Sequence, residues 1–472
     1  MSIQTTHPLY TQIQATWKLC RDAAAGETRV KENGTLYLPK PAGMNDAEYQ
    51  AYKLRSRFFG GPSRTIDGML GQLFRKPPIL SGAQVTTDPR KGERGEGCFE
   101  SITPEGMSLK ALARYTAKEL LTTGRFGLLA DLPAPTGPGA LSYLAPYEAE
   151  SILSWESRRI QGKLTLVSLV LQEQNWCKGA DTSKPDEFSL VTYRRHLGLS
   201  EQPDGSFEYF QQRYTQDLEN PERWNSEPPI YPEVRGQRLG YIPFVLFGTD
   251  RGYAPGKPPI LEVCHAAMSY YRSSADYENA LYFAGNPTPI ATGVDVNQAE
   301  PLRMGSSQFN AYASPETKVF LLELNGKSVT ELRENLHDKK AEIALLGLRM
   351  LEAPKLTSES AANQAMRQEG EKCYLATLAD EIGEGLSLAL AYWSELSALN
   401  WAPQIELNQD YRPGQMPISE AVQLAGLVES GYFPHSAYIS TLKKGELLPG
   451  DYPENEEKPM PKAPEMQGLP NG

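Results

Sequence analysis

The sequence predicts an α+β fold in which a β-rich block lies between two helical regions. Three observations lead to this prediction. Residues 45–75 and 107–123 carry helical spacing, with capping and breaking residues at the ends of the segments. Residues 125–248 change to alternating, β-branched and aromatic stretches separated by turn residues. From residue 259 onward the spacing becomes helical again.

The first helical region should consist of two pieces that are broken at Gly60-Gly61-Pro62. Asn45 or Asp46 is suited to cap the first piece. The sequence Lys76-Pro77-Pro78 should end the second piece, because proline cannot continue a helix.

The β-rich block is predicted from six stretches of strand-like composition. They are RFGLLADL, AESILSW, KLTLVSLVLQE, FSLVTYRRH, SFEYFQQRY and IPFVLFG. Long polar segments such as LPAPTGPGA and NPERWNSEPPIYPEVRGQ separate them, and we expect these segments to be surface loops.

Beyond the block, helices are predicted at 259–283 and 328–351, with a short β-like passage between them. Pro354 should interrupt the chain, and Thr357 or Ser358 should cap a long helix over 358–399. We expect this helix to bend at glycines 370, 383 and 385. A strand at PQIEL, small helices at 418–430 and 435–444, and a disordered proline-rich tail from Asp451 should follow.

The helix at 259–283 has an unusual face of tyrosines and small residues. Its members recur at steps of three and four: Val263, Ala267, Tyr270, Ser274, Tyr277, Leu281 and Ala284. A second such face runs along 328–351 through Leu336 and Ile343. Two interpretations are open. The helices form an antiparallel pair within one chain, or the tyrosine face contacts another subunit, because tyrosine suits an interface that stays partly wet.

Composition limits the classes of function. The chain has 472 residues, a net charge of -11, and five cysteines without a CxxC pair. This acidic balance argues against tight duplex binding, which uses clustered Lys and Arg. We expect a soluble protein with reduced thiols, because there is no secretory signal and no apolar run of ~18 residues that could span a membrane.

No stretch predicts catalysis. The NGKS sequence at 325–328 ends like a phosphate loop, but Leu321 stands where that motif needs its first glycine. The five histidines are isolated, and the carboxylate pairs lie on helix faces expected to be solvated. We therefore expect a protein that is not an enzyme and that binds neither a cofactor nor a metal.

Several stretches, taken in order, resemble the portal proteins of tailed bacteriophages, in a subgroup formerly catalogued as a domain of unknown function. The stretches are YLPKPAGMNDAEYQAYKLRSRFF, RTIDGMLGQLFRKPP, YEAESILSW, IPFVLFGTD, PPILEVCHAAMSYYRSSADYENALYFAG, LRENLHDKKAEIALLGLRML, EAPKLTSES and SAANQAMRQEGEKCYLATLADEIGEGLSLAL. The resemblance covers roughly residues 30–445, and the order of the set is more specific than any single motif. The short C-terminus departs from the pattern and leaves a large helical crown in doubt.

The resemblance implies a portal fold that assembles into a dodecameric ring around a DNA channel at one capsid vertex. It implies a wing at 1–258 with its β-rich part at 125–248, a first stem helix at 259–285, a clip at 286–327, a second stem helix at 328–351, a tunnel loop at 352–359, a long kinked wing helix at 360–399, a C-terminal wing or crown region at 400–450, and a disordered tail at 451–472.

The resemblance also implies two sets of functional residues. Those expected to face DNA in the channel are Lys339, Lys340, Arg349, Lys355, Thr357 and Ser358. Those expected at the contact between subunits are Tyr270, Ser274, Tyr277, Leu281, Leu336 and Ile343.

The implied partners are double-stranded DNA that passes through without sequence preference, the terminase large subunit, a major capsid or scaffolding protein, and a head-completion or adaptor protein. The implied location is the virion, after assembly in the host cytoplasm. One alternative is another head–tail connector or capsid component. A second, from a different class, is a metal-dependent enzyme acting on nucleic acid.

Overall fold

The structure is a computed structural model of the 472-residue chain. It describes residues 3–82, 86–88, 92–94, 99–133, 141–178, 186–217, 220–250, 252–285, 288–293, 316, 318–322, 326–348, 361–399, 403–409, 418–444, 447–448 and 452. The chain divides into two compact units, residues 1–409 and 410–472, and each is described by itself. The first unit mixes helices and antiparallel sheets, as the sequence predicts.

Four helices and one short turn open the first unit. They are α1 (Pro8–Ala25), α2 (Glu27–Glu32), the 3-10 turn η1 (Gly34–Leu36), α3 (Asp46–Arg55) and α4 (Gly61–Leu73). A capping box starts α3: the Glu48 N–H donates to Asn45 Oδ1 at 2.9 Å, and the Asn45 N–H donates to the Glu48 carboxylate at 2.8 Å. The predicted break between two helical pieces is confirmed, because α4 begins at Gly61-Pro62.

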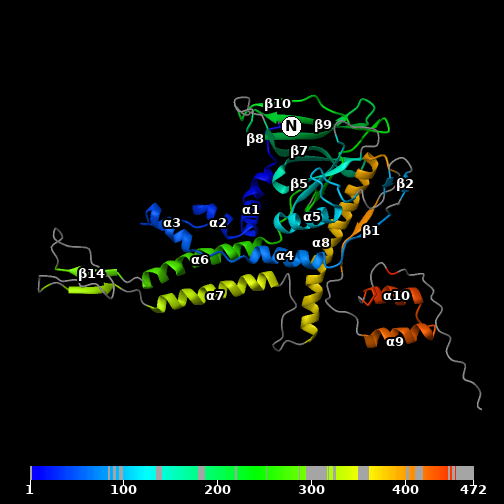
Figure 1. The fold of residues 1–472 in the computed structure, drawn as a ribbon. Helices are drawn as coiled ribbons and strands as arrows, with labels where there is room; N and C mark the ends of the chain where they lie inside the picture. Colours follow the sequence, from blue (N-terminus) through cyan, green and yellow to red (C-terminus); the bar gives the residue numbers. More distant parts are fainter. Residues whose placement is uncertain are drawn as a thin grey trace, which may run out of the picture. The chain divides into compact units, whose positions relative to one another are not determined.

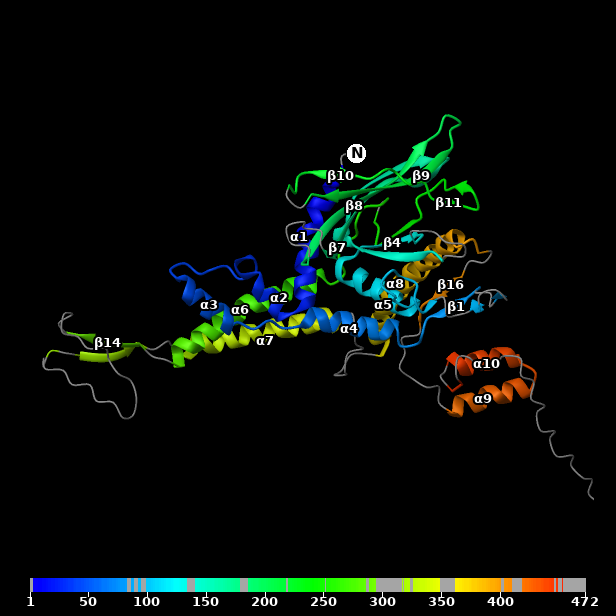
Figure 2. The ribbon, with the colours of Figure 1, turned by 45° about the horizontal axis from the view of Figure 1, so that its top comes forward.

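The predicted β-rich block forms two sheets. A five-stranded antiparallel sheet has the order β10-β9-β8-β7-β6, and a three-stranded sheet has the order β13-β4-β5. The strands are β4 (Phe126–Asp131), β5 (Tyr143–Glu148), β6 (Ile152–Ile160), β7 (Lys163–Lys178), β8 (Phe188–Glu201), β9 (Phe207–Gln216), β10 (Trp224–Ser226) and β13 (Phe244–Phe247). Figures 1 and 2 show the larger sheet stacked over the smaller one.

Smaller elements accompany these sheets. Helix α5 (Leu109–Thr123) precedes β4, and the 3-10 turn η3 (Ala149–Ser151) joins β5 to β6. Three further pairs of short strands are β1 (Ile79–Ser81) with β16 (Gln404–Glu406), β2 (Thr86–Asp88) with β3 (Gly92–Arg94), and β11 (Glu233–Val234) with β12 (Gln237–Arg238). The pair β1–β16 joins segments more than 300 residues apart, which the sequence did not predict.

Two long helices lie side by side and are joined through a two-stranded ribbon. Helix α6 (Leu261–Gly285) leads to β14 (Thr288–Thr292), which pairs antiparallel with β15 (Lys318–Leu322) before α7 (Gly326–Leu348) returns. Helices α6 and α7 contact each other, and Figure 1 shows the ribbon at their far end. The predicted helices at 259–283 and 328–351 are thereby confirmed over the described residues.

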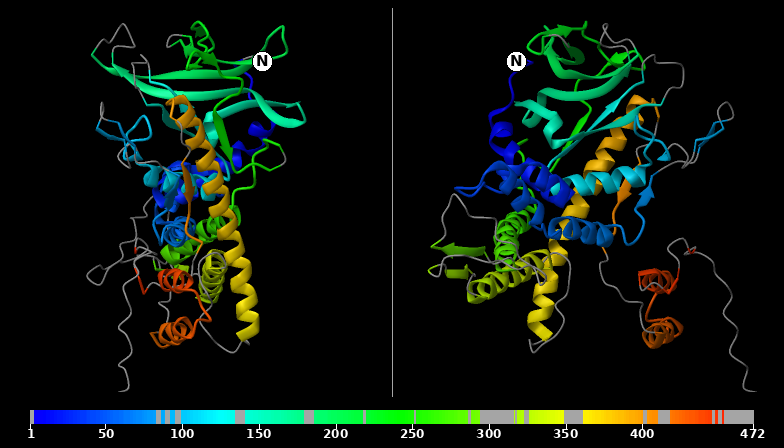
Figure 3. Two further views of the ribbon diagram at one scale, coloured as in Figure 1. Left: turned by 90° about the vertical axis from the view of Figure 1, so that its right-hand side faces the viewer. Right: turned by 60° about the vertical axis from the view of Figure 1, so that its left-hand side comes forward.

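Helix α8 (Ala361–Leu396) connects the helical and β-rich parts of the first unit. It contacts α4, α5 and all three strands of the smaller sheet, and Figure 3 shows it running from the helices to the sheets. Near its end the Trp393 indole N–H donates to the Ser142 carbonyl at 2.6 Å. Because Trp393 is 1% exposed, this contact fixes α8 in the core of the β-rich part.

Helix α8 is one continuous helix of 36 residues, so glycines 370, 383 and 385 do not interrupt it, and bends at them stay a prediction. Two of these glycines allow close packing. A Cβ atom at Gly385 would lie 2.2 Å from the Phe247 ring of β13, and one at Gly383 would lie 3.0 Å from the Ile405 carbonyl of β16. The missing side chains let the sheet and β16 lie directly against the helix.

The second unit contains two helices, α9 (Ile418–Glu429) and α10 (His435–Lys444), where the sequence predicted them. Ala421, Ile439 and Leu442 are buried between them. The predicted disordered tail, apart from Tyr452, lies outside the described residues.

Candidate assembly surface

The pairing of α6 with α7 accounts for the two helical faces seen in the sequence. Val263 and Ala267 of α6 are 1% and 0% exposed, and Leu336 and Ile343 of α7 are 8% and 1% exposed. Repeats at steps of three and four place such residues on one side of each helix. Helices α6 and α7 contact each other along their length. Of the two interpretations of the spacing, the structure shows the antiparallel pair within one chain.

Ser274 explains why this face contains small polar residues. Its hydroxyl donates to the Arg57 carbonyl at 2.7 Å, and its oxygen accepts the Arg57 N–H at 2.9 Å. Arg57 belongs to the link between α3 and α4, so the serine satisfies a backbone segment that crosses α6 without forming a helix or strand. A leucine at this position would leave both backbone groups of Arg57 without these partners.

These contacts correct the expectation that Ser274, Leu336 and Ile343 lie at a contact between subunits. All three are covered by their own chain, with exposures of 2%, 8% and 1%, and they have almost no surface left for a neighbour. Tyr270 and Tyr277 are half-buried and Leu281 is 39% exposed. These three keep surface for a second copy, and their role in assembly stays a prediction.

Close packing between α4 and α7 positions a group of cations. A Cβ atom at Gly61 would lie 2.3 Å from Ile343 Cγ2, and one at Gly347 would lie 2.6 Å from the Thr65 hydroxyl. This crossing places the Phe59 ring between two cations, with the Arg64 guanidinium carbon 5.5 Å and the Lys340 ammonium 5.4 Å from the ring centroid.

The residues predicted to face DNA are separated by the structure. The Lys339 ammonium lies against α6, where it donates to the Ser273 hydroxyl at 2.5 Å and to the Ser269 carbonyl at 3.4 Å. Lys339 is half-buried and bonds to α6, and its place in a channel stays a prediction. Lys340 is exposed beside Phe59. The other predicted residues, Arg349, Lys355, Thr357 and Ser358, lie outside the described residues.

Large apolar side chains are exposed where the helix pair meets the ribbon. Val319 and Phe320 of β15 are adjacent, so they point to opposite faces, and they are 47% and 49% exposed. Tyr282 and Phe283 at the end of α6 are 45% and 48% exposed. A two-stranded ribbon is marginal alone in water, and an apolar residue on each face gives it surface that a partner can bury.

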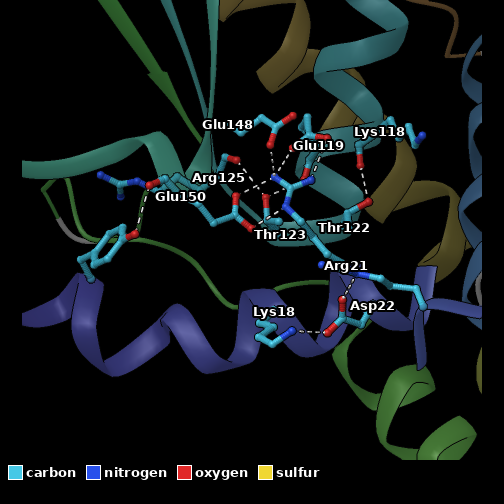
Figure 4. Close-up of polar contacts among 12 residues, drawn as sticks. Lys18, Arg21, Asp22, Lys118, Glu119, Thr122, Thr123, Arg125, Glu148 and Glu150 are labelled. Atoms are coloured by element: carbon cyan, nitrogen blue, oxygen red, sulfur yellow. Dashed lines mark hydrogen bonds and ion pairs between the residues drawn. The ribbon is translucent and has the colours of Figure 1, made fainter. Parts of the chain in front are cut away.

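An ionic cluster fixes α1 to the β-rich part (Figure 4). The Arg21 guanidinium donates to both Glu119 oxygens, at 2.7 and 3.2 Å, and to the Glu150 carboxylate, and it lies 3.4 Å from Glu148. Burial raises the pKa of Glu119, and Arg21 opposes that shift. The hydrogen bonds to Glu150 and Glu119 raise the pKa of Arg21 despite its burial. The sequence missed this cluster because its members come from four separate elements, α1, α5, β5 and η3.

A second buried ionic cluster lies between the two sheets. Arg195 of β8 contacts Asp131 of β4 at 2.5 Å and Glu173 of β7 at 2.9 Å. The Arg195 cation is thus neutralised inside the protein. It adds nothing to a surface for nucleic acid.

Metal sites and membrane-spanning helices are two further classes of feature. In the described ranges, no three His, Cys, Asp or Glu side chains are grouped so that they could hold a metal ion. None of the helices in the described part of the chain has the length and apolar character needed to cross a bilayer.

Comparison with known proteins gives three kinds of result. A family model described as "Domain of unknown function (DUF4055)" matches residues 259–396, which include α6, α7 and α8. No curated protein matches the chain.

Among solved structures, the chain is similar to one from the virion of a native gene transfer agent particle. The two are 14% identical with a TM-score of 0.41, over 88% of this chain and 98% of that one. A chain from the neck of the empty particle, computed with C6 symmetry, gives 14% identity and a TM-score of 0.40 over 88% and 98%. A chain from the neck of the native particle, computed with C12 symmetry, gives the same identity and score over 86% and 95%.

Proposed function

We propose that this protein is a portal protein: a non-enzymatic ring at one vertex of a phage capsid, through which double-stranded DNA passes during packaging and ejection. The observation that carries the proposal is the order of elements from α6 to α8. An antiparallel helix pair is joined by a two-stranded ribbon, and a 36-residue helix then runs back to the β-rich part. This is the order of stem, clip, stem and long helix that the sequence resemblance implies.

The contacts of the helix pair also support the proposal. The arm of two helices and a ribbon leaves part of its surface exposed, including Tyr282, Phe283 and Leu345. Side-by-side copies around an axis would cover those surfaces in a closed, heterologous arrangement. The acidic chain, at -11, would give the bore little attraction for phosphate, so DNA could slide without being held.

Under this proposal, the ribbon and the neighbouring apolar residues form the clip, which would bind the terminase large subunit and later the head-completion protein. The tunnel loop at 352–359, which lies outside the described residues, would enter the channel. The capsid or scaffolding protein would contact the wing. The protein would be found in the virion, after assembly in the host cytoplasm.

Electron microscopy and native mass spectrometry of the purified protein test the proposal. We expect rings of twelve copies with a central hole wide enough for a duplex. A protein that remains monomeric over the whole concentration range would overturn the proposal.

Two further measurements separate the alternatives. Rings that fail to bind the terminase large subunit would indicate another head–tail connector. Nuclease activity that a chelator abolishes would indicate the enzyme alternative.

A further inference from the structure

The charges on α7 are sorted onto separate sides of the helix. At ~100° of rotation per residue, Arg333 and Lys340 share one side, while Glu334, Asp338 and Glu342 share another, roughly 150° away. The buried line of α7, through Leu336 and Ile343, lies roughly 60° from the basic side and roughly 150° from the acidic side. The five charged residues are all exposed. The arm therefore has one flank of each charge.

The basic flank is defined by Arg64, Arg333 and Lys340, with the Phe59 ring among them. The contact of Gly61 with Ile343 holds α4 close enough to α7 for Arg64 and Lys340 to share that ring. Within the described residues, no carboxylate lies within ion-pair distance of any of the three cations. Two cations near one ring, without a carboxylate partner among the described side chains, give this flank a positive potential that favours an anionic partner.

The acidic flank is defined by Glu331, Glu334, Asp338 and Glu342, with Leu345 at its end. Glu334, Asp338 and Glu342 are four residues apart in turn, a spacing at which like charges destabilise a helix. Among the side chains that the structure describes, which do not include that of Lys327, none of the four acids is in an ion pair. Leu345 is 52% exposed, which gives this flank an apolar residue, as Phe59 does for the basic flank. The acidic flank therefore favours a cationic partner with an apolar centre.

We propose that the basic flank of one copy binds the acidic flank of the next copy, so that α7 and the start of α4 supply both halves of the contact between subunits. The proposal rests on the ring proposed above. Among the side chains that the structure describes, each flank is unpaired, and the two flanks are complementary in charge. Because the flanks lie on different sides of one helix, their pairing joins copies head to tail and generates a ring when the rotation closes. Duplex DNA is the competing occupant of the basic flank, but it would leave the four acids unpaired.

The contact between flanks would set the orientation of neighbouring copies. Exposed ion pairs add little stability one by one, but complementary flanks exclude the wrong orientation and fix the register of neighbouring copies. Assembly should therefore weaken as salt concentration rises, because exposed charges are screened.

Charge reversal of each flank tests the proposal in the full chain. The first variant carries Arg64→Glu, Arg333→Glu and Lys340→Glu. The second carries Glu334→Lys, Asp338→Lys and Glu342→Lys. A control with Lys110→Glu, Arg159→Glu and Lys163→Glu changes the net charge as much as the first variant, at exposed positions away from the arm. Thermal unfolding checks that each variant is folded.

We expect each reversed variant alone to associate at least about tenfold more weakly than the wild type, because like charges then face each other. The control should assemble normally. An equimolar mixture of the two variants should regain assembly, with the copies alternating, and a chain carrying all six substitutions should also assemble.

Three results would overturn the flank contact. They are normal assembly of both reversed variants, failure of their mixture to assemble, or a first variant that assembles normally but loses affinity for duplex DNA. Normal rings from the reversed variants would leave the proposed function intact. A wild type without rings would reject the portal, while the mixture would still decide whether the flanks bind each other.

Discussion

Gly61 lies so close to Ile343 that a Cβ atom on the glycine would stand 2.3 Å from Ile343 Cγ2. No real Cβ contact is that short, so α4 crosses α7 at a point where only glycine fits. The crossing positions Arg64 and Lys340 around Phe59 and holds the N-terminal helices against the α6–α7 arm. One missing side chain thereby determines the geometry of the proposed contact between copies.

Gly61→Ala should lower stability, because the added methyl group forces α4 and α7 apart or displaces Ile343. Overpacking of this kind costs roughly 1–3 kcal/mol, which thermal unfolding of the purified protein would detect. Gly71→Ala is the matched control. It lies in the same helix, its Cβ would meet nothing within 4 Å, and alanine in a helix is more stable than glycine by about 1 kcal/mol. Equal effects of the two substitutions would contradict the close crossing.

Ser274→Ala should destabilise the monomer and leave assembly unchanged. The substitution removes the hydroxyl that accepts the Arg57 N–H at 2.9 Å and donates to the Arg57 carbonyl at 2.7 Å. An unsatisfied buried polar group costs about 1–3 kcal/mol. Thermal unfolding measures the loss, and analytical ultracentrifugation measures association. Ser274→Thr keeps the hydroxyl, and a full rescue of the stability by it would support the hydrogen bond as the cause.

Tyr277→Ala should weaken assembly and leave the stability of the monomer largely unchanged, the opposite of Ser274→Ala. Tyr277 is half-buried in one copy and keeps surface for a neighbour. Truncation of an aromatic anchor commonly weakens an interface by about 2 kcal/mol or more, so sedimentation should show dissociation of the ring at higher protein concentrations than in the wild type. A lower unfolding temperature with unchanged association would instead place Tyr277 in the core of its own chain.

Local signals in the sequence were enough to predict most elements. The Asn45–Glu48 capping box, the Gly-Pro start of α4 and the alternating stretches of the β-rich block all depend on neighbouring residues, and each was found where predicted. Helix α1 was missed, although Pro8 at its start and Gly26 after its end are helix-boundary residues. Its buried side includes Tyr10, Trp17 and Cys20, which give a weaker apolar repeat than leucines would.

Relationships between distant residues were outside the reach of the sequence. Glycines 383 and 385 suggested bends because a helix interior disfavours glycine. The structure shows another reason for them: Ile405 and Phe247, which are distant in the sequence, pack where a side chain at these positions would lie. The tyrosine and serine face of α6 suggested a subunit contact, but Ser274 serves the backbone of Arg57, 217 positions away. Lys339 was expected in a channel, and its ammonium bonds to α6. In each case the role of the residue depends on a partner that is distant in the sequence.

Arg21→Ala should destabilise the protein, more at pH 7 than at pH 5. The substitution leaves Glu119, Glu148 and Glu150 without their shared cation. Removal of one partner from a buried ion pair lowers the free energy of unfolding by roughly 3 kcal/mol or more. Because Arg21 is 27% exposed, we expect a loss of roughly 3 kcal/mol or less. Burial already raises the pKa of Glu119 above its ordinary 4.5, and loss of Arg21 raises it further.

Because the pKa of Glu119 is raised, its carboxylate binds a proton more tightly in the folded chain than in the unfolded chain. The variant therefore gains stability as the pH falls towards 4.5. The difference in unfolding temperature between wild type and variant should therefore narrow from pH 7 to pH 5. Arg29→Ala is the control, because Arg29 is 55% exposed and pairs with Asp22 and Glu32 outside this cluster. A difference for Arg21→Ala that stays constant or widens on acidification would show that Glu119 does not depend on Arg21 for its charge.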